Sequence, residues 1–380
     1  MTEWKSVKVG DLGVIVTGKT PKTAIKENYG GTTPFLTPSD NMKVKFVSKT
    51  NKTLSEQGVL EVRKALIPQD SVCVSCIGSD LGKVVITTRP TVTNQQINSI
   101  IVDQNRFDVS FIYYAMSILG RELNFISKTS TAVPIVNKSS FSEYEILCPP
   151  LNIQHKIGKI LSSLDDKIDL NNKINDNLEQ QALELFLNYQ KLADKKICFT
   201  DGIQILGGGT PKTKESTYWD GDILFFTPKD VNCPYTISTE KTITEDGLNH
   251  CNSRLYPVNT VFVTARGTVG KVCISGVPMA MNQSCYALVG KNLHQLMVYF
   301  YTLATVERLK HKASGAVFDA ITTRDFSSEY ISKLSEQDEQ AFVKIVEPMF
   351  QMMLSNVFEN KKLENLRDTL LPKLMTGEML

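Results

Sequence analysis

Apolar residues recur with helical spacing in two long stretches of the chain. The first runs from Asn152 to about Ala193, and the second lies 185 residues further on, near the C-terminus. In each stretch the central positions repeat every seven residues, which places their side chains along one face of a helix. These positions are Ile157, Leu164, Asn171, Leu178 and Leu185 in the first stretch and Phe342, Met349, Asn356, Leu363 and Leu370 in the second. We predict that they form a seam between two long helices.

The two predicted helices are long enough to pair with each other. Helices of about 40 residues would each extend roughly 60 Å, at about 1.5 Å per residue. An antiparallel coiled coil with pseudo-two-fold symmetry would bring Asn171 and Asn356 together at its centre, where buried amides select one register. The alternative is that each helix packs separately on its own domain. Asp165 and Asp166 are expected on a solvated face of the first helix.

The segments 1–150 and 196–335 have a different pattern, with short runs rich in β-branched residues. Ser71–Ser75 and Thr260–Thr264 are typical of strands, and the Gly, Pro, Asn and Asp residues between such runs indicate turns. Each segment ends in a helical stretch. The predicted fold class is therefore α+β, with two similar globular domains built on a twisted or barrel-like sheet, each followed by a long helix.

Short motifs repeat between these two segments. Thr20–Thr23 (Thr-Pro-Lys-Thr) returns 190 residues later as Thr210–Thr213, and Phe35–Asp40 returns at the same offset as Phe225–Asp230. A period of this length indicates a duplicated domain rather than a solenoid repeat of a few tens of residues. Because the residues inside the repeated frame differ, we expect the two domains to recognise different things.

Composition narrows the class of protein. The chain has 380 residues, of which 42% are hydrophobic and 22% charged, as in ordinary soluble globular proteins. It lacks a secretory pattern and an apolar run of about 20 residues, so we expect a cytoplasmic protein. Its eight cysteines are irregularly spaced, and the pair Cys73 and Cys76 is expected to be two buried thiols rather than half of a zinc site. The net charge of +2 does not by itself indicate nucleic-acid binding.

The motifs of a catalytic site are missing from the sequence. Gly78–Lys83 and Gly267–Lys271 are each followed by valine, so neither is a P-loop with its Mg²⁺-binding hydroxyl. Gly207–Gly209 precedes Thr210-Pro211, which prevents a helix from beginning on the glycines as a dinucleotide site requires. None of the four histidines lies at metal-ligand spacing from another. We therefore predict a non-catalytic protein with no metal or cofactor of its own.

Loops in both domains carry side chains suited to phosphates and base edges. Lysine, arginine and hydroxyl groups contact phosphates, and Asn and Gln amides pair with adenine edges. For any single residue, an exposed lysine or a turn-capping amide is the alternative. Recurrence at matched positions favours a DNA-binding surface. The candidates are Lys19, Thr20, Lys22, Thr23, Lys83, Asn94, Gln95, Gln96, Lys212, Thr213, Lys214, Lys229, Arg266, Lys271, Asn282, Gln283 and Arg324.

In this arrangement the chain resembles, over its whole length, the specificity (S) subunit of type I restriction–modification systems. The resemblance is carried by the duplicated Gly-x-Thr-Pro and Phe-x-Thr-Pro-x-Asp loops, by Pro149–Gln154 (Pro-Pro-Leu-x-x-Gln) and by the closing Leu371–Gly377. The second helix departs from the family pattern, because Lys333–Gln337 at its entry lacks the double proline.

The resemblance implies a non-catalytic subunit that binds a bipartite double-stranded DNA sequence, one domain per half-site. Residues 1–150 and 196–335 would be the target-recognition domains. Residues 151–195 and 336–380 would be spacer helices that recruit two modification (methyltransferase) subunits and, through them, the restriction motor and nuclease subunits. S-adenosylmethionine, ATP and Mg²⁺ would belong to those partners. The residues alone leave two alternatives open: a two-domain protein-binding scaffold without DNA specificity, and an enzyme whose active site is shared between the halves.

Overall fold

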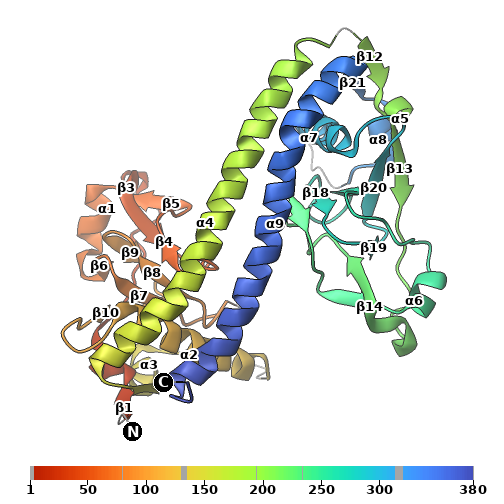
Figure 1. Cartoon of the computed structure of the whole chain (residues 1–380). Coiled ribbons are helices and arrows are strands. Elements are labelled where there is room, and N and C mark those ends of the chain that lie inside the picture. Colours follow the sequence, from red (N-terminus) through yellow and green to blue (C-terminus); the bar gives the residue numbers. More distant parts are fainter. Residues whose placement is uncertain are drawn as a thin grey trace. The chain divides into compact units, whose positions relative to one another are not determined.

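The computed structural model describes residues 4–78, 80–129, 135–193, 195–232, 234–312 and 320–379. These residues form two compact units, one made of residues 1–167 with 363–380 and the other of residues 168–362. Two long helices, α4 (Leu151–Gln190) and α9 (Glu336–Met375), contribute to both units. The remaining elements of each unit form one α+β domain (Figure 1).

The domain of the first unit is built on two sheets. A five-stranded sheet has the order β2-β10-β7-β8-β4, and a four-stranded sheet has the order β5-β3-β9-β6. The short strands β1 and β11 pair with each other. The elements are β1 Lys5–Lys8, η1 Val9–Asp11, β2 Gly13–Thr17, η2 Lys26–Asn28, β3 Tyr29–Leu36, β4 Phe46–Val47, β5 Lys52–Leu54, α1 Glu56–Glu61, η3 Arg63–Ala65, β6 Leu66–Ile67, β7 Ser71–Ser75, β8 Val84–Thr87, β9 Thr91–Thr93, β10 Ile97–Val102, α2 Val109–Thr129, α3 Lys138–Glu143 and β11 Glu145–Cys148.

The second unit repeats this topology. Its five-stranded sheet has the order β13-β20-β17-β18-β15, a three-stranded sheet has the order β16-β14-β19, and β12 pairs with β21. The elements are β12 Lys195–Cys198, α5 Phe199–Gly202, β13 Ile203–Gly207, η4 Ser216–Tyr218, β14 Trp219–Phe226, β15 Tyr235–Thr236, β16 Lys241–Ile243, α6 Glu245–Asn249, β17 Val261–Thr264, β18 Val272–Ser275, β19 Met279–Met281, β20 Cys285–Gly290, α7 Gln295–Lys312, α8 Thr323–Ser327 and β21 Tyr330–Lys333. The duplication predicted from the motifs is therefore a duplication of fold.

Each domain buries one face of its five-stranded sheet against a helix. In the first, Val72, Val74 and Ile86 of the sheet share a core with Phe111 and Met116 of α2. In the second, strand residues such as Val261 and Ile274 share a core with α7, whose residues from Leu296 to Thr302 are all buried. The α+β fold class is confirmed. The functional boundaries at residues 150, 195 and 335 stay predictions.

The long helices begin for different local reasons. Pro149-Pro150 precedes α4, which starts at Leu151, as expected for residues that favour the first turn. The α9 entry has no proline. Instead the Ser335 hydroxyl accepts a hydrogen bond from the Asp338 backbone N–H at 3.1 Å and donates one to its carboxylate at 2.6 Å. This serine cap satisfies a free backbone donor, so the departure from the family pattern leaves α9 beginning at Glu336.

The two long helices pair in antiparallel fashion, as predicted (Figure 1). In the second unit Phe186 of α4 lies 5.8 Å, ring to ring, from Phe342 near the start of α9. In the first unit Ile157 and Leu161 of α4 share a core with Leu371 and Leu374 near the end of α9. All ten predicted seam positions are buried or half-buried.

Four asparagines bond across this seam in the second unit. Asn171 donates to Asn360 Oδ1 at 2.9 Å and to Glu359 at 2.7 Å, and Asn356 donates to Asn175 Oδ1 at 2.8 Å. The 185-residue repeat relates Asn171 to Asn356 and Asn175 to Asn360, so the two bonds are equivalent. Asn171 and Asn356 thus bond to neighbours one turn away rather than to each other, because each helix carries two seam asparagines. We call this set the asparagine quartet.

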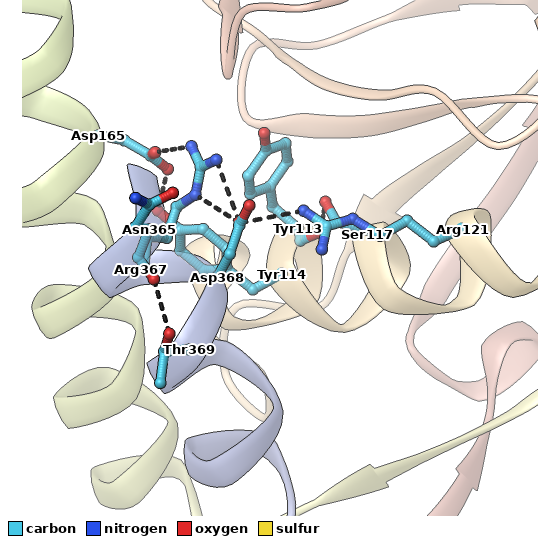
Figure 2. A network of polar contacts seen from close by, with 9 residues as sticks. All are labelled: Tyr113, Tyr114, Ser117, Arg121, Asp165, Asn365, Arg367, Asp368 and Thr369. Carbon is cyan, nitrogen blue, oxygen red and sulfur yellow. Dashed lines mark hydrogen bonds and ion pairs between the residues drawn. The ribbon is translucent and has the colours of Figure 1, made fainter. Parts of the chain in front are cut away.

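A charged network fixes the end of α9 in the first unit. The Asp165 carboxylate accepts a hydrogen bond from Arg367 at 2.7 Å and one from the Tyr114 hydroxyl at 2.5 Å. Arg367 also reaches Asp368, which pairs with Arg121 of α2 at 3.3 Å (Figure 2). The Asp165 side chain is only 13% exposed. The expectation that Asp165 lies on a solvated face is therefore wrong, because α2 and α9 cover it; Asp166 is exposed.

The cysteines follow their predicted environment. Cys73 lies in β7 and is fully buried, and Cys76 follows that strand and is also buried. Burial raises the pKa of Cys73 to about 12 and that of Cys76 to about 11, which the nearby Ser99 and Asn98 only partly oppose. Both side chains are thus uncharged thiols that pack as small hydrophobic residues.

Candidate nucleic-acid interface

The Thr-Pro loop of each domain follows the first strand of the five-stranded sheet and packs tightly against the turn before its neighbour. A Cβ atom on Gly18 would lie 2.1 Å from the Asn94 carbonyl oxygen, and one on Gly208 would lie 2.3 Å from that of Asn282. Only glycine allows this approach. The loop is then held from outside, because Thr20 donates to the Gln95 side chain at 2.7 Å. The equivalent residues Thr210 and Gln283 make the same bond.

An aromatic residue anchors each Thr-Pro loop to the second sheet. The Tyr29 hydroxyl donates to the Pro21 carbonyl at 3.0 Å, and Trp219 Nε1 donates to the Lys212 carbonyl at 3.2 Å. Burial and then the Glu61 carboxylate raise the pKa of Tyr29, so the phenol remains a donor. Tyr29 and Trp219 start the equivalent strands β3 and β14. The loops are therefore positioned by the same device in both domains, with a different aromatic ring.

An aspartate fixes the next part of the surface. The Asp40 carboxylate accepts from the Thr37 N–H at 2.7 Å and from the Asn51 N–H at 2.6 Å. In the second domain Asp230 accepts from the Thr227 and Glu240 N–H groups, both at 2.7 Å. Charge-assisted bonds of this kind are the stronger class. The Phe-x-Thr-Pro-x-Asp motif is therefore a clamp that holds the backbone just before β5 and β16.

These loops enclose a pocket in each domain. The pocket of the second domain has a volume of about 570 Å³, and its lining includes Thr213, Trp219, Glu240, Lys241, Arg266 and Asn282. The pocket of the first domain, about 400 Å³, is lined by the equivalent Thr23, Tyr29, Asn51 and Lys52. Figure 1 shows the strands β3 and β14 that carry these pockets. We call them the first and second recognition pockets.

The structure brings some of the predicted DNA-binding residues to these pockets. Thr23 lines the first pocket, and Thr213, Lys229, Arg266 and Asn282 line the second. The exposed candidates are Lys19, Lys22, Thr23, Gln95, Lys212, Thr213, Lys214, Lys229, Arg266, Lys271, Gln283 and Arg324, and the half-buried ones are Thr20, Lys83, Gln96 and Asn282. Arg324 lies apart from the pocket linings, on α8.

Besides the Thr20–Gln95 bond, further candidates make contacts within the protein. Asn94 is 7% exposed, and its carboxamide bonds the backbone N–H of Gln96 at 3.1 Å and the Gln96 side chain at 2.9 Å. Asn282 bonds the Ser284 N–H in the same way at 3.0 Å. Lys83 pairs with Asp80 at 2.7 Å. These amides shape the turns beside the pockets, as turn-forming asparagines commonly do, and the DNA contacts of the candidate set stay predictions.

Sequence reasoning missed four further residues that line the pockets, two in each domain. Tyr29, Trp219, Asn51 and Glu240 were not candidates, although Lys52-Thr53 and Lys241-Thr242 beside them repeat in the sequence. This repeat is only two residues long, and its offset is 189 residues, whereas the Thr-Pro and Phe-x-Thr-Pro-x-Asp motifs repeat at an offset of 190. The shared backbone bond to Asp40 or Asp230 makes the equivalence of Asn51 and Glu240 clear.

Among the described residues, no group of three or more His, Cys, Asp or Glu side chains could hold a metal ion. Within that part of the chain, no helix is long and apolar enough to span a membrane.

The chain is similar over nearly its whole length to known specificity subunits. It is 26% identical over 99% of its length to the type I restriction enzyme MjaIX specificity subunit of Methanocaldococcus jannaschii, of which 94% is covered. It is 35% identical over 48% of its length to the HindI specificity subunit of Haemophilus influenzae, of which 40% is covered.

A solved structure shares the fold. The S subunit of a type I restriction–modification system from M. genitalium matches 98% of this chain and 96% of its own, with a TM-score of 0.56 at 18% identity. The family model described as "Type I restriction modification DNA specificity domain" matches residues 1–180 and again 195–366. Because this family model covers most of the chain, the chain belongs to the type I restriction–modification DNA specificity family.

Proposed function

We propose that each recognition pocket reads one half of a bipartite double-stranded DNA sequence. The family is that of the DNA-specificity subunit, which is non-catalytic, of a type I restriction–modification system. The observation that carries the proposal is that one pocket frame occurs twice in the chain with different side chains on it. A duplicated reader with unequal side chains suits a target whose two halves differ.

The charge and shape of the pocket surroundings support DNA as the ligand. Exposed Lys212, Lys214, Lys229, Arg266 and Lys271 surround or neighbour the second pocket. Cationic side chains contact phosphates and fix the position of a protein on the DNA duplex, whereas side chains that reach base edges select the sequence. At the first pocket, Lys52 belongs to the lining and exposed Lys22 precedes the lining residue Thr23. A protein-binding scaffold would not need cationic side chains at both pockets.

We infer that the long helices bind the modification subunits. In the second unit, α4 exposes Leu170, Leu183 and Leu187, and α9 exposes Ile345 and Met352. Apolar side chains exposed along paired helices are typical of a protein interface. Two methyltransferase subunits and, through them, the restriction subunits would assemble on this chain. S-adenosylmethionine, ATP and Mg²⁺ would be bound by those partners.

Replacing Lys212 with alanine is expected to weaken binding to all DNA sequences alike. A lysine that contacts phosphate contributes to affinity without reading bases, so its loss should reduce the salt slope of log K by about one unit. Fluorescence anisotropy of the full chain in complex with its modification subunits, over a range of salt concentrations, measures both quantities.

The matched control is Lys138→Ala. Lys138 is an exposed lysine at the first residue of α3. Helix α3 packs on η1, which precedes β2, whereas the Thr-Pro loop follows β2. This variant should keep the wild-type slope. Binding that does not weaken as salt rises would contradict DNA recognition and favour the protein-scaffold alternative.

A further inference from the structure

The two recognition pockets allow a comparison of equivalent positions within one chain. The frame is the same in both, because Thr23, Phe35, Asp40 and Lys52 correspond to Thr213, Phe225, Asp230 and Lys241. Thr50 and Thr239 also match, each accepting the strand N–H of the equivalent phenylalanine at 3.2 Å. Residues shared in this way hold the backbone, so the side chains that differ on it are the ones able to give the pockets different ligands.

Two of the differing positions change their chemistry completely. Asn51 in the first pocket corresponds to Glu240 in the second, since both backbone N–H groups bond to the clamp aspartate. Ile77 corresponds to Arg266, since each follows the third strand along the sheet and forms an isolated bridge, to Ile135 and Ala320 respectively. The lining of the second pocket therefore includes a carboxylate and a guanidinium. At the equivalent positions of the first domain stand the amide of Asn51, which lines the first pocket, and the alkyl side chain of Ile77, which lies outside its lining.

A carboxylate on this surface needs a specific reason. DNA is a polyanion, so an acidic side chain at its interface weakens binding unless it accepts a hydrogen bond from a base. Among the described residues Glu240 makes no ion pair or side-chain hydrogen bond, although Lys241 and Arg266 line the same pocket. Lys241 instead lies over the Trp219 ring at 5.4 Å. Glu240 is thus held by its backbone while its exposed carboxylate remains available to a ligand.

We propose that Glu240 and Arg266 read a guanine–cytosine pair in the second half-site, and that Asn51 reads an adenine in the first. This inference rests on the proposed function. Glutamate accepts from the cytosine N4 amino group and arginine donates to guanine O6 and N7, whereas asparagine pairs with the N6 and N7 edge of adenine. The position shared by Asn51 and Glu240 is then a specificity-determining position of both domains.

The test is a base-preference profile of variants in the complete complex. Glu240→Gln keeps the size of the side chain and removes its charge. It is expected to reduce discrimination at one base pair of the second half-site by roughly 5- to 150-fold, the range for one good base contact. The first half-site should be unchanged. Selection from randomised DNA by the full chain with its modification subunits gives the preference at every position.

Asn51→Glu is the reciprocal variant, and it should change preference at one base pair of the first half-site only. Asp201→Asn is the control for loss of a negative charge. Asp201 is an exposed acid on α5, which precedes β13, whereas the Thr-Pro loop of this domain follows β13. Asp201→Asn should leave both half-sites unchanged. Thermal melting checks that each variant is folded, as expected for exposed side chains whose frame comes from Asp40 and Asp230.

Each outcome separates this inference from the proposed function. If Glu240→Gln leaves the second half-site unaltered while Lys212→Ala still weakens DNA binding, the base-reading assignment is overturned and the proposed function stands. If both half-sites relax together, one domain does not read one half-site. If the wild-type complex selects no sequence, the proposed function itself fails.

Discussion

Replacing Asp165 with alanine is expected to destabilise the first unit by about 3–5 kcal/mol, as when one partner of a buried ion pair is removed. Asp165 and Arg367 are 13% and 24% exposed, and Asp165 also accepts from the Tyr114 hydroxyl. Its loss leaves the partly buried Arg367 guanidinium with only the exposed Asp368 as a partner, and it removes the acceptor of the Tyr114 hydroxyl. The end of α9 should then separate from the domain, which hydrogen exchange of the amides of residues 363–376 would detect.

Lys45 adds a pH dependence to this prediction. It is 8% exposed and bonds to Ser162 at 2.5 Å, and burial lowers its pKa while Asp165 opposes the effect. In Asp165→Ala the strongest of the three opposing carboxylates is gone and only Asp166 and Asp108 remain, so the pKa of Lys45 should fall further. A lysine whose folded pKa is lowered binds its proton more tightly when unfolded, so stability rises as pH rises toward the ordinary value of about 10.4. The variant should therefore regain stability between neutral and alkaline pH more than the wild type.

Arg121→Ala is the matched control within the same network (Figure 2). Its ion pair with Asp368 is 3.3 Å long, with the two side chains 61% and 47% exposed. Exposed ion pairs contribute about 0–1 kcal/mol to stability. In a denaturant titration this variant should therefore unfold close to the midpoint of the wild type, and hydrogen exchange of residues 363–376 should be nearly unchanged. Equal losses in Asp165→Ala and Arg121→Ala would contradict a buried role for Asp165.

The features predicted correctly from sequence were those with a period. A seven-residue repeat defines the seam, and a second copy of the Thr-Pro and Phe-x-Thr-Pro-x-Asp motifs defines the duplicated domain. Both patterns are local or repeated, so they can be seen without the fold. The helix entry at Glu336 needed only one capping serine, which sequence reasoning overlooked because the family motif there is proline.

Contacts between distant residues could not be predicted in this way. Asp165 and Arg367 are separated by 202 positions, and neither belongs to a repeated motif. The 185-residue repeat of the long helices does not extend to the residues of this network. Phe350 occupies the position equivalent to Asp165, and it packs on Phe300 with ring centroids 5.6 Å apart. The first unit thus has a charged network where the second has an aromatic cluster, and a duplicated frame alone gives no sign of that difference.

The recognition pockets fall between these two cases. Their loops repeat in sequence, but the residues that differ between them stand out only once the frame is superposed by its hydrogen bonds. Asn94 and Asn282 were predicted to contact DNA because they repeat, but their side-chain oxygens accept hydrogen bonds from backbone N–H groups within turns. Asn51 and Glu240 did not repeat, and for that reason they are the better candidates for sequence selection.

Replacing all four residues of the asparagine quartet with leucine is expected to stabilise the coiled coil of the second unit and to reduce its specificity of register. Asn171, Asn175 and Asn360 are no more than 7% exposed. Buried polar groups at a seam cost stability and select alignment, and exchanging a whole buried polar set for apolar residues commonly gains about 1–4 kcal/mol. The thermal midpoint should therefore rise.

Replacing one member should have the opposite effect. Asn360→Leu removes the acceptor of Asn171 and the donor to Asn172, so it should cost about 1–3 kcal/mol, the penalty of a buried polar group left unpaired. Asn177→Leu, at an exposed position of α4, is the control for adding leucine and should stay within about 0.5 kcal/mol of the wild type. A double-mutant cycle between Asn171 and Asn360 measures their coupling.

Register itself can be read with a photo-cross-linking amino acid at Leu178, a half-buried seam residue of α4. In the wild type the adducts on α9 should form one cluster. They should lie on the N-terminal side of Asn356, because the helices are antiparallel and Asn356 bonds to Asn175. In the four-leucine variant a second cluster should appear about seven residues away, since leucines in a heptad pattern pack equally well after a shift of one repeat. A single unchanged cluster together with a raised midpoint would show that the quartet costs stability without selecting the register, and that the domains or loops align the helices instead.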